Sequence, residues 1–165
     1  MDTFEAFRDR ISVREYSEKP VEKEKLEKMV DAGRLAPTAR GEQPWEFVVV
    51  TNKEKLKELA DITSDNGKFM AGASAAIVIF CKDTKYYLED GCAAAENVLL
   101  AAAAQGVASC WIAGDKKEYA GRIVKALNVP ENFKLISIVS LGYPKAKPEP
   151  HFKRHLKEVI HWEKF

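Results

Sequence analysis

The chain has little of what marks secreted, membrane or metal-binding proteins. It holds three cysteines and three histidines in 165 residues, and no two cysteines stand in a C-x-x-C spacing. No apolar run approaches the roughly 20 residues that span a bilayer. Residues 1–5 are acidic and lack the apolar core of a secretory signal. We therefore expect a cytoplasmic protein with reduced thiols, no membrane partner and no metal.

An excess of one charge is also missing. Lys and Arg number 26 and Asp and Glu number 25, which leaves a formal net charge of +1. Nucleic-acid-binding proteins usually carry a clear basic excess, so we expect no nucleic-acid partner. A hydrophobic content of 46% and this length indicate one domain that covers residues 1–165.

The spacing of apolar residues predicts about five helices and four strands in an α+β or α/β layered domain. The helices are expected over residues 2–9, 21–35, 52–60, 83–105 and 115–127. The strands, rich in β-branched and aromatic side chains, are expected over residues 45–51, 75–81, 109–113 and 135–141. Asp115 with Glu118 resembles a capping box at the start of the last helix.

Two segments have side chains that favour packing against another surface. Residues 93–104 contain seven alanines, and small side chains let another helix approach closely. We expect the long helix over residues 83–105 to pack against a partner subunit; strong helix propensity in a monomer core is the alternative. The C-terminal tail is expected to be extended, and its Trp162 and Phe165 need something to cover them.

Two guanidiniums and a hydroxyl recur at every second residue near the N-terminus, as Arg10, Ser12 and Arg14. Alternate residues of an extended segment point the same way, so these three would face one ligand while Ile11 and Val13 face the core. A phosphate between the arginines would offset their repulsion and match their hydrogen-bonding geometry. Pairing of the arginines with nearby surface carboxylates is the alternative.

Residues 36–44 form a polar loop that leads into an apolar strand. Pro37 restricts the backbone, and the small Thr38 and Ala39 would let backbone amides lie against a planar ring. The side chain of Gln43 can donate and accept hydrogen bonds at once. The loop therefore predicts a surface for a flat, hydrogen-bonding ligand, with an ordinary loop before a strand as the alternative.

Together these motifs resemble those of the nitroreductase family of FMN-dependent oxidoreductases. The family's R-x-S-x-R/K-x-F/Y pattern is matched at residues 10–16, and its A-P-S/T-A-x-N-x-Q-P-W-x-F pattern at residues 36–47 except at Gly41. Three further matches follow in the family's order: G-L-G-S-C-W-I-G at residues 106–114, G-Y-P at 142–144, and L-x-E-V-V-x-W at 156–162. The matches span almost the whole chain.

The resemblance implies a three-layer α/β/α sandwich with a mostly antiparallel sheet. It also implies a homodimer with FMN at the subunit interface, a long central interface helix and a C-terminal tail exchanged between subunits. The residues expected at the phosphate are Arg10, Ser12, Arg14 and Arg154, with Lys153 as the second choice for the last. Pro37, Thr38 and Ala39 (backbone) and Gln43 (side chain) are expected to meet the flavin ring from the other subunit. Asn66 (side chain) and Ala113 and Gly114 (backbone) are also expected at the ring.

The implied electron donor is NADH or NADPH, and the implied acceptor is a nitroaromatic, a quinone or a similar small molecule, used in alternation at flavin N5. Because the cofactor would carry the chemistry, no catalytic side chain is expected. Two alternatives stay open. One is a non-enzymatic FMN-binding or storage protein; the other is a specialised flavin-dependent reductase, such as a dehalogenase, on the same fold.

The chain departs from the family pattern in three places. Gly41 replaces the usual asparagine, and Ala113 stands where some members carry glycine or glutamate. The stretch between Lys82 and Gly91 has no room for the inserted helix that often covers the substrate. The acceptor therefore cannot be carried over from the family. Cys110 neighbours the expected flavin edge, where we expect a packed thiol rather than a redox group.

Overall fold

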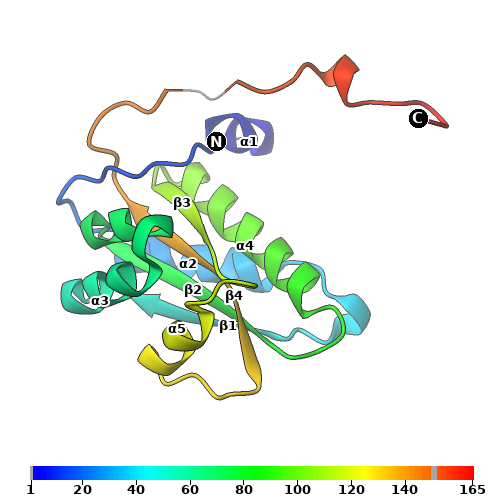
Figure 1. Ribbon diagram of the computed structural model, residues 1–165. Helices are drawn as coiled ribbons and strands as arrows, with labels where there is room; N and C mark the ends of the chain where they lie inside the picture. The colour runs from blue at the N-terminus through cyan, green and yellow to red at the C-terminus, as the bar shows by residue number, and fades with distance from the viewer. Residues whose placement is uncertain (1, 150–151) are drawn as a thin grey trace.

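Four strands form one antiparallel sheet in the order β1-β2-β4-β3. They are β1 (Trp45–Val50), β2 (Ala75–Lys82), β3 (Ala108–Ala113) and β4 (Phe133–Gly142). The structure is a computed structural model that describes residues 2–149 and 152–165 (Figure 1). All four expected strands are confirmed, and β1 and β3 form the two edges of the sheet.

Helices cover both faces of the sheet (Figure 1). The α-helices are α1 (Thr3–Asp9), α2 (Lys23–Arg34), α3 (Lys53–Thr63), α4 (Tyr87–Ala104) and α5 (Ala120–Ala126). Short 3-10 segments are η1 (Ala39–Gly41), η2 (Ser64–Asn66), η3 (Lys68–Gly72) and η4 (Leu156–Glu158). Helices α2 and α4 pack on one face, whereas α3 and α5 pack on the other.

The central strand β2 shows why the fold has three layers. Its Ile77 and Ile79 belong to the core beneath α2 and α4, whereas Val78 and Phe80 belong to the core beneath α3 and α5. All four side chains are fully buried. A strand buried on both faces needs apolar residues at every position, which explains the continuous apolar run in the sequence. The predicted α/β/α sandwich is confirmed.

Two helix starts differ from the prediction by four residues or more. Helix α4 begins at Tyr87 rather than at residue 83, and α5 begins at Ala120 rather than at Asp115. Asp115 does not cap α5: its N–H donates to the Ile136 carbonyl at 3.1 Å, and its side chain accepts from the Tyr87 hydroxyl at 3.0 Å. The local capping pattern at Asp115 is therefore outcompeted by contacts with β4 and α4, which are distant in the sequence.

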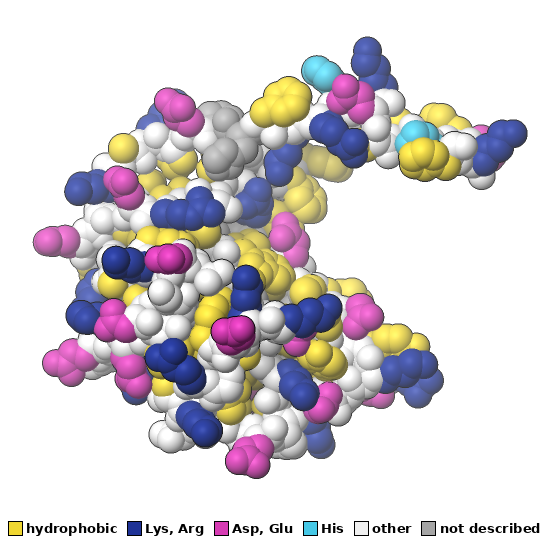
Figure 2. Space-filling model, in the orientation of Figure 1, with side chains coloured by type: hydrophobic (Ala, Val, Ile, Leu, Met, Phe, Trp, Pro, Cys, Tyr) yellow, Lys and Arg dark blue, Asp and Glu magenta, His cyan; other side chains and the backbone are white. Residues whose placement is uncertain are grey.

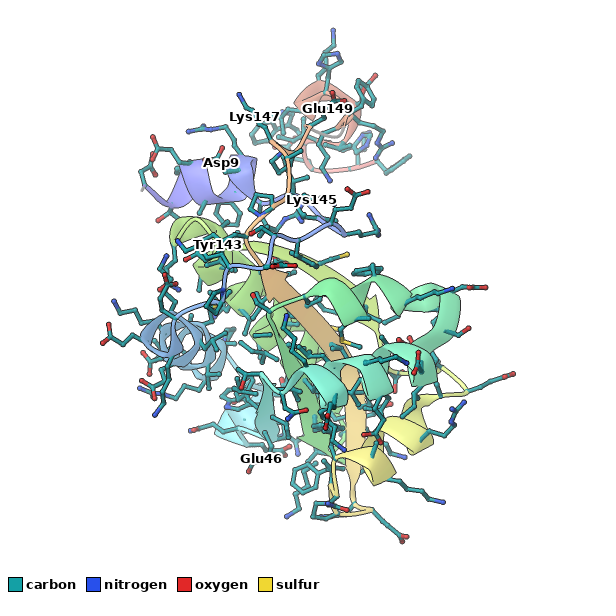
Figure 3. The ribbon with its side chains drawn as sticks, turned by 90° about the vertical axis from the view of Figure 1, so that its left-hand side faces the viewer. Asp9, Glu46, Tyr143, Lys145, Lys147 and Glu149 are labelled. Atoms are coloured by element: carbon teal, nitrogen blue, oxygen red, sulfur yellow. The ribbon has the colours of Figure 1, made fainter. Side chains whose placement is uncertain are left out.

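The chain leaves the sheet after β4 and runs past α1 into an exposed tail. Tyr143, Lys145 and Lys147 mark this path beside Asp9, at the opposite end of the molecule from Glu46 (Figure 3). The tail stands off from the body as an arm that bears apolar side chains (Figure 2). Its exposed large apolar residues are Phe152, Leu156, Val159, Ile160, Trp162 and Phe165. Within the described residues, no helix is both long enough and apolar enough to cross a membrane.

Candidate functional site

The N-terminal segment that follows α1 lies along the outer edge of β3. The Val13 N–H donates to the Ser109 carbonyl at 2.9 Å, and Ser12 and Ser109 form an isolated parallel bridge. Further along, the Ser17 N–H donates to the Tyr143 carbonyl at 2.8 Å. The segment is therefore extended, as its alternating pattern predicts, and is attached to both β3 and the end of β4.

Tyr16 anchors this segment to β4. Its hydroxyl lies 2.7 Å from the Val13 carbonyl and 2.8 Å from the Ser140 hydroxyl oxygen, and its side chain is 9% exposed. Burial raises the pKa of the Tyr16 phenol, against a smaller lowering by the hydrogen bond to Ser140, so the phenol stays neutral. Gly142 makes room for the ring, because a Cβ there would lie 2.7 Å from the Tyr16 Cδ1.

Arg10, Ser12 and Arg14 lie on the segment beside the start of β3, where Ser12 bridges to Ser109. All three lower the pKa of the Cys110 thiol, by charge or by hydrogen bonding. Arg10 also lines a cavity of about 180 Å³ between the segment and the last turn of α4. Neither arginine forms an ion pair with any residue in 2–149 or 152–165, so the alternative of surface pairing is not what the described residues show.

The expected alternation of sides holds in part. Val13 is 9% exposed and buried, whereas Ile11 is only half-buried. The Arg14 guanidinium is exposed and lies 5.5 Å from the centroid of the Phe69 ring on η3. Such a cation–π contact positions a guanidinium without using up its hydrogen-bond donors. Phe69 is a contact that the sequence did not single out.

Cys110 itself is a packed thiol. Burial raises the pKa of Cys110, and the opposing influence of Arg14, Ser12 and Arg10 is smaller. A thiol kept neutral is a poor nucleophile. A neutral Cys110 therefore offers the two guanidiniums no negative charge to pair with.

The far end of β3 combines a tight turn with backbone that faces away from β4. Ser109 turns its carbonyl outward to Val13, and residues two apart in a strand face the same way, so Ala113 also faces the open edge. Gly114 is required by the fold: a Cβ there would lie 2.7 Å from the Ile136 carbonyl oxygen. The Ala113 carbonyl accepts from the Tyr119 hydroxyl.

Asn66 lies close to this end of β3. Its side-chain oxygen accepts from the Lys117 ammonium at 3.1 Å, and Lys117 is part of the turn that follows Gly114. The hydrogen bond to Lys117 thus places Asn66 near Gly114 and Ala113. Lys117 is a second residue that the sequence reasoning missed, since one lysine in a Lys-rich turn has no distinguishing signal.

The loop that carries Pro37, Thr38, Ala39 and Gln43 lies elsewhere, against the first turn of α4. The Ala39 N–H donates to Asp90 Oδ1 at 2.9 Å. Pro37 and Gln43 are exposed, and Thr38 and Ala39 are half-buried. Within residues 2–149 and 152–165, no hydrogen bond joins this loop to the N-terminal segment or to the β3 edge.

Arg154 stands on the exposed tail, as does Lys153. No ion pair or hydrogen bond connects either side chain to the rest of the described chain. Within one chain, the structure therefore brings together Arg10, Ser12 and Arg14 at one end of β3 and Asn66, Ala113 and Gly114 at the other. The loop and the tail, which the sequence assigns to the same site, do not join them.

An anion at one end of β3 and a hydrogen-bonding ring along its free edge would suit these residues. Two guanidiniums without carboxylate partners match a phosphate, and the outward-facing backbone of Ala113 matches a flat, hydrogen-bonding ligand. Among the described residues, no group of three or more His, Cys, Asp or Glu could hold a metal ion. The donors and cations present thus fit a phosphate-bearing, planar cofactor such as FMN.

Comparisons with known proteins agree. The model of the nitroreductase family matches residues 7–74 and 66–143. A protein from Archaeoglobus fulgidus is 40% identical over 144 residues, which cover 82% of each chain. A solved structure from Bacteroides thetaiotaomicron has a TM-score of 0.93 at 34% identity and covers 99% of this chain and 98% of its own. Both are named "Putative NADH dehydrogenase/NAD(P)H nitroreductase".

A further solved structure names the cofactor. It is an FMN-dependent nitroreductase from Clostridium difficile, with a TM-score of 0.92 and 33% identity. It covers 98% of this chain and 99% of its own. The likeness therefore extends over the whole chain rather than over the motifs alone.

Proposed function

Because the chain belongs to the nitroreductase family, we propose that it is an NAD(P)H-dependent flavin oxidoreductase that holds FMN along the edge of β3. The observation that carries this proposal is the placement of Arg10, Ser12 and Arg14 on the segment beside β3, with neither arginine in an ion pair within the described chain. These residues would bind the FMN phosphate. Arg154, or Lys153 in its place, would complete the phosphate site from a tail.

The ring would be held by backbone and amide groups. Ala113 and Gly114 would present their backbone to the N5 and O4 edge, and the Asn66 amide would lie at the pyrimidine edge. When bound, FMN supplies the redox chemistry, accepting a hydride from NADH or NADPH and returning electrons to a nitroaromatic, quinone or similar acceptor. Donor and acceptor use one site in turn, which predicts ping-pong kinetics.

This chain's own residues position the cofactor and stabilise charge. Donors fixed by the fold, such as the Ala113 N–H on its strand, can favour negative charge on the ring without having to reorganise. The stretch from β2 to α4 is only residues 83–86, so no inserted helix covers this end of the sheet. An open site favours a broad range of flat acceptors.

The proposed protein is a homodimer with FMN at the subunit interface. The loop with Pro37, Thr38, Ala39 and Gln43 does not reach the β3 edge of its own chain, so we assign it to the partner's flavin. The alanine-rich α4 would lie at the interface.

The tail would be exchanged between subunits. A groove with a volume of about 670 Å³ lies between α2 and the free edge of β1, lined by apolar side chains such as Val21, Leu26, Val30 and Val49. The exposed apolar residues of the partner's tail suit that groove.

The decisive experiment is a visible spectrum of the purified protein before and after NADH or NADPH is added. We expect a yellow protein whose flavin absorbance is bleached by the donor and restored by a quinone or nitroaromatic. Flavin that binds but does not turn over would identify an FMN-binding or storage protein instead. A colourless protein that takes up no FMN would defeat the proposal altogether.

A further inference from the structure

Asp90 is a buried carboxylate in the first turn of α4. Its side chain belongs to a residue that is 4% exposed, and Oδ1 accepts the Ala39 N–H at 2.9 Å. Its second oxygen, Oδ2, is buried and has no hydrogen-bond partner among residues 2–149 and 152–165. A buried carboxylate with one oxygen that has no hydrogen bond lowers the free energy of unfolding. Its presence therefore suggests that Asp90 has a function that offsets this loss.

The loop that Asp90 contacts is strained. Arg40, Gly41 and Gln43 have φ of +57°, +67° and +48°, so three residues within four adopt the left-handed region. Only glycine adopts that region without steric cost, and Arg40 and Gln43 therefore need an outside constraint. Left-handed residues of this kind persist where the surrounding structure over-determines them.

Asp90 is the constraint that the described residues provide. The internal bonds of the loop are long: the Gly41 N–H to the Thr38 carbonyl and the Gln43 N–H to the Thr38 hydroxyl oxygen are both 3.3 Å, and the Glu42 N–H to the Ala39 carbonyl is 3.2 Å. Within the part of the chain that the structure describes, Asp90 is the one side chain outside residues 37–43 that hydrogen-bonds to the loop. A bond to a charged acceptor is stronger than one between neutral groups.

We infer that Asp90 is a positioning residue of the flavin site, which holds the loop of residues 37–43 through the Ala39 N–H in the conformation that meets FMN. This inference deepens the proposed function and depends on it. Asp90 does not touch the cofactor itself. Because it stands in α4, it would also tie the shape of the loop to the helix that we place at the dimer interface.

The test compares Asp90→Ala and Asp90→Asn with the wild type and with Glu89→Gln. Glu89 is exposed in the same turn, so its substitution removes one negative charge from the helix start without touching the loop. Three quantities are measured: the FMN dissociation constant of the stripped protein by flavin fluorescence, the exchange rate of the Ala39 amide by NMR, and the melting temperature without FMN.

We expect Asp90→Ala to speed Ala39 exchange and to weaken FMN binding by about tenfold. Asp90→Asn keeps an acceptor oxygen, so it should restore most of that affinity, and Glu89→Gln should bind FMN like the wild type. If Asp90→Ala does not fold, Asp90→Leu, which is similar in size to aspartate and has no acceptor oxygen, takes its place. In the variant without an acceptor, FMN binding weaker than wild type at an unchanged melting temperature supports the inference, whereas unchanged binding overturns it.

The two hypotheses fail in different ways. A wild type that binds FMN, together with a folded Asp90→Ala that binds it equally well, overturns the positioning role alone. A wild type that takes up no FMN overturns the proposed function, and the inference with it. A lower melting temperature in Asp90→Ala with unchanged FMN affinity would make Asp90 a purely structural residue and would also overturn the inference.

Discussion

Gly142 lies against the face of Tyr16 so closely that a Cβ at Gly142 would come within 2.7 Å of the Tyr16 Cδ1 and 2.9 Å of its Cγ. Both atoms belong to the Tyr16 ring, which is buried and has no room to move away from Gly142. The contact fixes the segment that presents Arg10, Ser12 and Arg14. Gly142, at the end of β4, thus helps to hold the segment that carries the proposed phosphate site.

Gly142→Ala should therefore lower the free energy of unfolding by about 1–3 kcal/mol, the usual cost of overpacking. Urea unfolding followed by circular dichroism measures it. Gly121→Ala is the matched control: it stands in α5 with open space at the Cβ position, so alanine there should be neutral or stabilising by about 0.5–1 kcal/mol. Equal effects at the two glycines would contradict the steric argument.

Arg10→Ala should weaken FMN binding by about tenfold or more, because a hydrogen bond to a charged group contributes about 1.5–3 kcal/mol. Titration of stripped protein with FMN gives the dissociation constant. Arg34→Ala serves as the control, since Arg34 is an exposed arginine on α2 that pairs with Asp31 at 2.6 Å. An affinity for FMN that is unchanged in Arg10→Ala would remove Arg10 from the phosphate site.

The double substitution Trp162→Ala and Phe165→Ala should weaken the homodimer. These side chains are 75% and 105% exposed in the single chain, and covering an aromatic side chain contributes about 1.5–3 kcal/mol. Sedimentation equilibrium over a range of concentrations measures the dimer constant. The control replaces the neighbouring Glu163 and Lys164 by alanine. If both double variants dimerise alike, the tail does not cross to a partner.

The protein should lose stability at alkaline pH through Cys81. Burial, with a smaller contribution from the charge of Asp90, raises the pKa of the Cys81 thiol from 9.0 to about 12. The folded state therefore favours the neutral thiol. That contribution is fully present below pH 9, where the unfolded thiol is neutral as well, and is lost as the pH rises from about 9 to about 12.

Unfolding free energies measured in urea from neutral pH to about pH 11 test this. Cys81→Ala should show a smaller decline between pH 9 and pH 11 than the wild type, whatever its absolute stability. Parallel declines in the two proteins would show that Cys81 does not contribute to the alkaline loss.

Much of the fold was predictable because burial leaves a periodic trace. The apolar run at residues 75–81 predicts a strand covered on both faces, and the alternation at residues 10–14 predicts an extended segment. Gly106 stands directly after the alanine-rich stretch and Gln105, and it has a φ of +69° just beyond α4, a conformation typical of glycine at a helix end. The order of the motifs also sufficed to predict the family. In each case the pattern is formed by residues that are close in the sequence, so it can be recognised without the tertiary structure.

Tertiary structure alone decided which partners the polar groups took. Asp115 has the pattern of a helix cap but bonds to Tyr87 and to β4, and Asp90 looks like an ordinary acidic residue of a first turn yet holds Ala39, which is 51 positions away. A polar side chain bonds to whatever the packing of apolar faces brings beside it. Local patterns set which face is buried, whereas the choice of partner depends on how the layers meet.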